Sequence, residues 1–101
     1  MKLYHRTTNN AAAAIMANGF RDGSGTYGTG TQFSGVWLSN VPLDENEGAT
    51  GDALLEVIID GRTIAHYEWK QEPAFGYREW LIPASIVNQR GRARQGASHP
   101  E

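Results

Sequence analysis

Residues 53–59, ALLEVII, are an apolar run broken only by Glu56, and they end in β-branched side chains. A short run of this kind is typical of a buried β-strand. The pair Asp60-Gly61 that follows is typical of a hairpin turn. We therefore expect residues 62–69, RTIAHYEW, to return as a second strand beside the first.

Three further segments outside this hairpin also have strand character. Residues 35–39, GVWLS, have the composition of a buried strand, and residues 2–7, KLYHRT, form a short β-prone run at the start of the chain. Residues 78–87, REWLIPASIV, predict a last strand that Pro83 interrupts. The strands thus extend over most of the chain.

One main helix is predicted near the N-terminus. Residues 11–18, AAAAIMAN, are mostly good helix formers. Asn9 or Asn10 can cap the start of this helix, and Gly19 is suited to its C-terminal cap. The expected order of elements is β-α-β-β-β-β, which is an α+β fold class.

The length of 101 residues indicates one domain. Residues 22–34, DGSGTYGTGTQFS, have the composition of a mobile surface loop. Residues 90–101, RGRARQGASHPE, are expected to form a poorly ordered tail, which leaves residues 1–89 as the folded domain. This domain has one modest core, so a site must lie on the core elements themselves.

Composition excludes several classes of site. The chain has no cysteine and therefore no disulfide, thiolate zinc site or cysteine nucleophile. No apolar stretch approaches the roughly 18–20 residues that span a bilayer, and the start lacks an apolar signal core. No metal site is indicated, and we expect a cytoplasmic protein without membrane contact.

The charge is unevenly distributed. The net charge is −2, and residues 44–60 contain acidic side chains but no Lys or Arg. Residues 90–101 instead carry three arginines. Nucleic-acid binding normally requires a basic face, so the acidic body argues against a nucleic-acid groove.

Polar or aromatic side chains interrupt three of the predicted strands. They are His5 in LYHRT, Trp37 with Ser39 in GVWLS, and Glu79 in EWLIP. Each one alone is more often a structural residue or, for Glu79, a solvated one. The order of the three along the chain is more informative than any single residue.

In this order the three segments resemble the ADP-ribosyltransferase superfamily of the poly-ADP-ribose polymerase and diphtheria-toxin type. That family has motifs with His, Tyr and Glu on three separate strands. Here they match residues 3–7, 35–39 and 79–83. The predicted helix and Gly19-Phe20 after the first motif fit as well, so the resemblance covers residues 3 to about 88. It implies a small split β-sheet domain that uses NAD.

The resemblance also implies roles for the motif residues. Glu79 is the expected catalytic residue, because a carboxylate stabilises the positive charge that develops on the ribose and can hold its 2′-hydroxyl. Trp37 would stack on the flat, cationic nicotinamide ring. His5 would bind ribose hydroxyls, and the backbone at Arg6 would hold the carboxamide.

Further cofactor contacts are expected from neighbouring residues. Thr7 and Ser39 could add hydroxyl contacts, and Arg6 with Arg21 could supply positive charge for the pyrophosphate. The loop of residues 22–34, with Tyr27, would fold over the bound dinucleotide.

The sequence departs from the family pattern at a few places. Arg6 stands where the family has Gly, and Trp37 where it has Tyr. Residues 38–65 contain no aromatic side chain, so Tyr27 or Tyr67 would have to provide the second face for nicotinamide. Glu68 is a reserve candidate for the catalytic acid.

Three functions stay open at this point. The first is transfer of ADP-ribose from NAD to a protein, nucleic-acid or small-molecule acceptor, an activity that would suit a toxin. The second is NAD hydrolysis, with water as acceptor. The third is a non-catalytic module that binds NAD, ADP-ribose or a protein segment, which has no need of a carboxylate facing the ribose.

Overall fold

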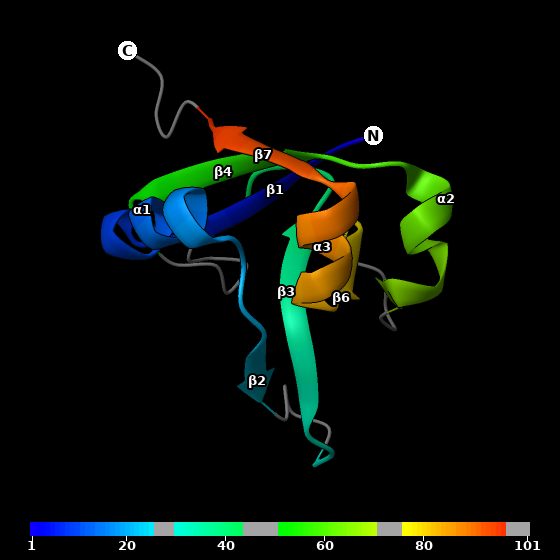
Figure 1. Ribbon diagram of the computed structural model, residues 1–101. Coiled ribbons are helices and arrows are strands. Elements are labelled where there is room, and N and C mark those ends of the chain that lie inside the picture. Colours follow the sequence, from blue (N-terminus) through cyan, green and yellow to red (C-terminus); the bar gives the residue numbers. More distant parts are fainter. Residues whose placement is uncertain (26–29, 44–50, 71–75, 97–101) are drawn as a thin grey trace.

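The computed structural model describes residues 1–25, 30–43, 51–70 and 76–96, and it is an α+β fold (Figure 1). No helix in these ranges has the length and apolar character that crossing a membrane requires. In chain order the described elements are β1 (Lys2–Thr7), α1 (Asn9–Asn18), β2 (Gly23–Gly25), β3 (Phe33–Ser39), β4 (Ala53–Ile58), α2 (Gly61–Ile64), the 3-10 helix η2 (Ala65–Tyr67), β5 (Glu68–Trp69), β6 (Glu79–Ile82), α3 (Ala84–Arg90) and β7 (Arg92–Gln95).

The strands form an antiparallel sheet in the order β5-β6-β3-β1-β4-β7, with β2 paired to the first half of β3. The β1–β4 ladder is long and runs from Lys2–Ile58 to Thr7–Ala53. In contrast, β1 and β3 are joined at one bridge, Tyr4–Ser39. Beyond it β3 turns away from β1 (Figure 1), so the sheet divides into a β5-β6-β3 half and a β1-β4-β7 half.

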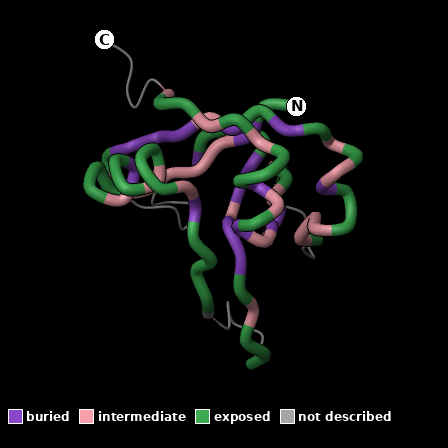
Figure 2. The backbone as a smooth tube through the Cα atoms, in the orientation of Figure 1, coloured by how far each residue is buried: buried purple, intermediate pink, exposed green. Residues whose placement is uncertain are grey.

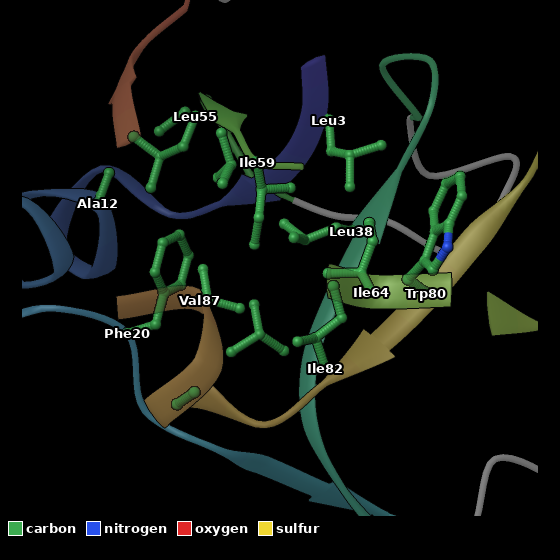
Figure 3. Packing of buried hydrophobic residues seen from close by; sticks show 14 residues of the cluster. Leu3, Ala12, Phe20, Leu38, Leu55, Ile59, Ile64, Trp80, Ile82 and Val87 are labelled. Atoms are coloured by element: carbon green, nitrogen blue, oxygen red, sulfur yellow. The ribbon is translucent and has the colours of Figure 1, made fainter. Parts of the chain in front are cut away.

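One hydrophobic core connects the two halves with the helices (Figure 3). The β2–β3 hairpin projects away from it and is largely exposed (Figure 2). Because side chains alternate along a strand, β3, β4 and β6 each give the core every second residue. The buried cluster consists of Leu3, Ala12, Phe20, Val36, Leu38, Ala53, Leu55, Val57, Ile59, Ile64, Trp80, Ile82, Ala84 and Val87.

The N-terminal helix was predicted correctly, but its cap was not. Helix α1 covers the predicted segment and ends before Gly19, which has φ 89°. The capping side chain is that of Thr8, whose Oγ1 accepts a hydrogen bond from the Ala11 N–H at 3.1 Å. Asn9 and Asn10 lie inside the first turn instead.

The strand predicted over residues 62–69 is wrong except at its end. The segment forms α2 and η2, and β5 contains just Glu68 and Trp69. The cause is Asp60, whose side chain accepts a hydrogen bond from the Arg62 N–H at 2.9 Å. It therefore caps a helix rather than forming a hairpin turn, and the helix buries Ile64 completely.

The last predicted strand is correct only up to Pro83. Strand β6 ends at Ile82, and α3 follows with Pro83 as its N-terminal cap. Proline has no N–H to continue a ladder, and its fixed φ suits the start of a helix. Asp22, distant in sequence, accepts a hydrogen bond from the Ala84 N–H at 2.7 Å and so satisfies the first turn of α3.

Two segments that were expected to lack regular structure contain strands. In the predicted loop of residues 22–34, β2 pairs with β3, as between Gly25 and Phe33. In the predicted tail of residues 90–101, β7 pairs with β4 and turns Ala93 toward the core. The Arg and Gly content of the tail concealed this alternation, and the folded domain therefore extends beyond residue 89. Residues 26–29 and 97–101 lie outside the described ranges.

Helix α3 is short and is held by Asn88. The Asn88 side chain accepts a hydrogen bond from the Phe20 N–H at 2.8 Å and donates one to the Phe20 carbonyl at 3.0 Å. Asn88→Ala would leave both backbone groups of the buried Phe20 without this partner, so we expect a loss of about 1–3 kcal/mol in the free energy of unfolding. Chemical denaturation monitored by circular dichroism measures it.

Asn10→Ala, at an exposed position of α1, is the matched control for this substitution. It should change the free energy of unfolding by less than about 0.5 kcal/mol. Equal losses in the two variants would show that the Asn88 contacts do not hold α3 in place.

Candidate functional site

The three sequence motifs lie on neighbouring strands. Strand β3, with Trp37, stands between β1, with His5, and β6, with Glu79. This sheet order makes the motifs neighbours, but they do not share one face. His5 pairs with the buried Leu55 and so faces the core. Trp37 and Glu79 lie on the opposite face. Among the described residues, no three His, Asp or Glu side chains are grouped as metal ligands would be.

His5 lies where β1 and β3 part. Its Nδ1 is 2.8 Å from the carbonyl oxygen of Trp37. A carbonyl can only accept, so Nδ1 carries the hydrogen in this contact. The side chain thereby satisfies a strand carbonyl close to the point where the ladder between the two strands ends. The ring also packs edge-on against Phe20, with centroids 5.5 Å apart.

The environment of His5 favours the neutral ring. Burial lowers the pKa of the imidazole below its ordinary value of 6.5, and the hydrogen bond to Trp37 opposes this shift only in part. With the hydrogen on Nδ1, the second ring nitrogen, Nε2, bears a lone pair. His5 can therefore accept a hydrogen bond from a hydroxyl group such as that of a ribose.

Trp37 and Glu79 lie on one face of the β3–β6 ladder. The register pairs Trp37 with Leu81 and Ser39 with Glu79, so these four side chains share a face. Trp37 and Glu79 are both half-buried. The alternate residues Leu38 and Trp80 face the core and are 1% exposed. Site and core thus use opposite faces of the same two strands.

Trp69 is a site residue that the sequence did not reveal. It pairs with Glu79 across β5 and β6, which places it on the same face. Its ring meets that of Trp37 edge-on, with centroids 5.2 Å apart and planes at 74°. The ring of Phe33 also packs edge-on against that of Trp69, with centroids 5.1 Å apart.

These contacts answer the question of the second aromatic side chain in part. Tyr67 packs against the hydrophobic core, and Tyr27 lies outside the described residues. Trp69 is an aromatic side chain of the described residues that contacts Trp37. In the sequence Trp69 is visible as the aromatic residue at the end of RTIAHYEW. Its place beside Trp37 follows only from the pairing of β5 with β6.

The guanidinium of Arg6 is held by backbone carbonyls. Its Nε donates a hydrogen bond to the Leu43 carbonyl, and Nη1 lies 3.5 Å from the Gly51 carbonyl. These contacts use Nε and Nη1 of the guanidinium, and the binding of pyrophosphate by Arg6 stays a prediction. The role predicted for the Arg6 backbone is separate from them and stays a prediction, as does that of the half-buried Thr7.

Gly51 passes close to the end of β1. Its φ is 122°, a region that L-residues rarely adopt. A Cβ on it would lie 2.1 Å from the carbonyl oxygen of Thr7. Only glycine therefore fits at this position beside the first motif.

The hydroxyl of Ser39 also has backbone partners. Ser39 is 5% exposed, and its Oγ donates to the Val41 carbonyl at 2.6 Å, with the Tyr4 carbonyl at 3.4 Å. These contacts fix the bridge between β1 and β3. The structure therefore gives Ser39 a supporting position, and a cofactor contact by its hydroxyl stays a prediction.

The Glu68 carboxylate is bonded to Arg78 and is poorly placed to replace Glu79 as the catalytic acid. Glu68 pairs with Trp80 in the register, so it faces away from Trp37. Arg78 donates two hydrogen bonds to its carboxylate, at 2.8 and 2.9 Å. The hydrogen bonding by Arg78 is the main cause of a lowered Glu68 pKa, while burial acts in the opposite direction. Glu68 is thus an ionised structural group.

The lowered pKa of His5 predicts how stability depends on pH. Between the folded-state pKa and 6.5 the unfolded chain binds more protons than the folded one. Stability from this group is therefore complete above pH 6.5 and is lost as the pH falls through the folded-state pKa, with a slope of at most about 1.4 kcal/mol per pH unit.

Urea denaturation between pH 8 and about 5, above the range in which most carboxylates titrate, should show this loss. In His5→Gln the slope should be smaller. His66→Gln, which removes an exposed imidazole from η2, is the control. An unchanged slope in His5→Gln would contradict the prediction.

Similarity to known proteins gives no further guidance on function. The chain matches no protein-family model, no curated protein and no solved structure in the comparisons made. The function must therefore be inferred from the chain's own residues and their geometry.

Proposed function

We propose that the protein is an ADP-ribosyltransferase that binds NAD where β1 and β3 part and cleaves its nicotinamide–ribose bond. One observation carries the proposal. Trp37 and Glu79 share a half-buried face of β3 and β6, and the backbone of Trp37 is bonded to His5. A stacking ring and a carboxylate thus share one face of β3 and β6. The His5 imidazole lies on the core face beside Phe20 and reaches β3 through the Trp37 carbonyl.

Binding of the nicotinamide half of NAD rests on the aromatic pair. Trp37 and Trp69 meet edge-on, so their ring planes form a corner. A flat cationic ring that stacks on Trp37 also meets an aromatic wall at its side, and both interactions favour a positive charge. In the proposed complex His5 also accepts a hydrogen bond from a ribose hydroxyl at Nε2. Because the His5 ring lies on the core face, this contact requires the gap where β1 and β3 part.

The chemistry requires no redox step. The bond between C1′ of the ribose and the nicotinamide nitrogen breaks, and its electron pair leaves with nicotinamide, which becomes neutral. C1′ acquires oxocarbenium character, and the Glu79 carboxylate stabilises this charge and holds the 2′-hydroxyl. A lone pair of the acceptor then forms the new bond to C1′, and the acceptor proton passes to solvent.

The acceptor is a protein, a nucleic acid, a small molecule or water. With water, the same steps make the protein an NAD glycohydrolase. A site that binds NAD without reacting would be a binding module. The three functions require the same Trp37 face. Transfer and hydrolysis share the role of Glu79 and differ in the acceptor, whereas a binding module does not need the Glu79 charge.

Replacing Glu79 tests the catalytic role. Nicotinamide release from NAD, measured by chromatography, should fall by about 10²–10³-fold in Glu79→Gln, because the charge that faces the ribose is lost. NAD should still raise the melting temperature of this variant, since the aromatic and imidazole contacts remain.

Glu68→Gln is the matched control, because it removes a carboxylate from the next strand but from the opposite face. It should keep nicotinamide release near the wild-type rate once circular dichroism shows that it is folded. No release and no thermal shift in the wild type would refute the proposal. Binding without release in both wild type and Glu79→Gln would assign the protein as a binding module.

A further inference from the structure

Strand β7 ends the sheet, and one of its edges faces away from β4. The hydrogen bond from the Gly96 N–H to the Leu54 carbonyl, at 2.7 Å, fixes the phase of the ladder. In an antiparallel pair only alternate residues bond to the neighbour. Arg92 and Arg94 therefore bond to β4, and the N–H and C=O groups of Ala93 and Gln95 point outward.

A groove accompanies this edge on the face that the helices cover, and its lining combines apolar side chains with polar surface. It lies between α1, α3 and β7 and has a volume of about 220 Å³. Its apolar lining includes Ile15, Met16, Phe20, Val87 and Ala93. Met16 is 45% exposed. Asn88, also in the lining, is already bonded to the backbone of Phe20, so the apolar side chains of the lining are the part that a bound apolar side chain would contact.

The opposite face of β7 is cationic. Arg92 and Arg94 are exposed there and alternate with Ala93. Arg94 forms an ion pair with Glu56 at 2.8 Å, yet its side chain keeps 63% exposure. Arg92 has no ion pair within the described part of the chain. The edge therefore combines outward backbone groups that have no strand partner among the described residues, a groove partly lined by apolar side chains on one face and positive charge on the other.

We propose that β7 binds an extended peptide segment in which apolar and acidic residues alternate. The segment adds a strand to the sheet through the outward backbone groups of Ala93 and Gln95. Its apolar side chains enter the groove beside Met16, and its acidic side chains face Arg92 and Arg94. A strand has a side-chain period of two, so one alternating segment satisfies both faces at once.

A second copy of this chain fits the edge less well. Antiparallel pairing of two β7 strands would place the arginines of one copy on the same face as those of the other, and like charges in such positions are destabilising. Acidic side chains in the added strand remove this repulsion. The inference does not depend on NAD chemistry, so its outcome is separate from that of the proposed function.

A synthetic peptide tests the binding. The probe is a fluorescein-labelled peptide in which Glu and Val alternate over about seven residues, somewhat longer than a typical strand. Its fluorescence anisotropy is titrated with the full chain at low salt. The control peptide has the same composition with its valines contiguous. We expect saturable binding of the alternating peptide and at least tenfold weaker binding of the control.

Three substitutions test the geometry. Ala93→Pro removes an N–H that points outward, so pairing with β4 is retained while affinity falls about tenfold. Met16→Glu places a like charge at the groove and should weaken binding by a similar factor. It changes an exposed residue, so it provides the test if Ala93→Pro does not fold. Arg92→Gln should weaken binding about threefold.

Lys70→Gln is the matched control for Arg92→Gln, because it neutralises an exposed cation beside the opposite edge of the sheet. It should leave the affinity unchanged. The proposal is overturned if the alternating peptide does not bind at about 1 mM, or if both peptides bind equally. It is also overturned if Met16→Glu has no effect, or if the chain dimerises through β7 and excludes the peptide.

Discussion

The bridge between Tyr4 and Ser39 is the constraint on which the rest of the structure depends. It joins two half-sheets that are each well paired internally. Within the described ranges it is the one backbone pairing between the two halves. Because the ladder ends there, the carbonyl of Trp37 needs another donor, and the His5 ring supplies it. One side chain of the core face therefore closes a gap in the sheet and fixes the backbone of Trp37, a residue of the candidate site.

A short chain can accommodate a core and a site because strands have two faces. On β3 and β6, Leu38 and Trp80 fill the core, whereas their neighbours Trp37 and Glu79 stand on the other face. The helices cover one face only, so the site needs no additional element. The arrangement also couples the packing of the core to the geometry of the site. A shift in the β3–β6 register by one residue would move the site residues into the core.

The sequence allowed the α+β class, the first helix and the strands that carry the motifs to be predicted, because each depends on local side-chain pattern. Other features depend on contacts between distant residues. Asp22 completes the start of α3, and Trp69 joins Trp37 through the pairing of β5 with β6. Likewise, the Arg-rich segment becomes β7 only because β4 offers it an edge. Periodicity contains no information about such partners.

Arg6 contacts the carbonyls of both Leu43 and Gly51, and Gly51 itself lies against the end of β1. The two ends of the connection between them are thus anchored to a strand that does not depend on the connection. The entropic cost of joining two fixed ends grows only slowly with the length of the segment between them, by about 0.6 kcal/mol for each doubling. Insertions between residues 43 and 51 are therefore expected to cost the sheet little stability.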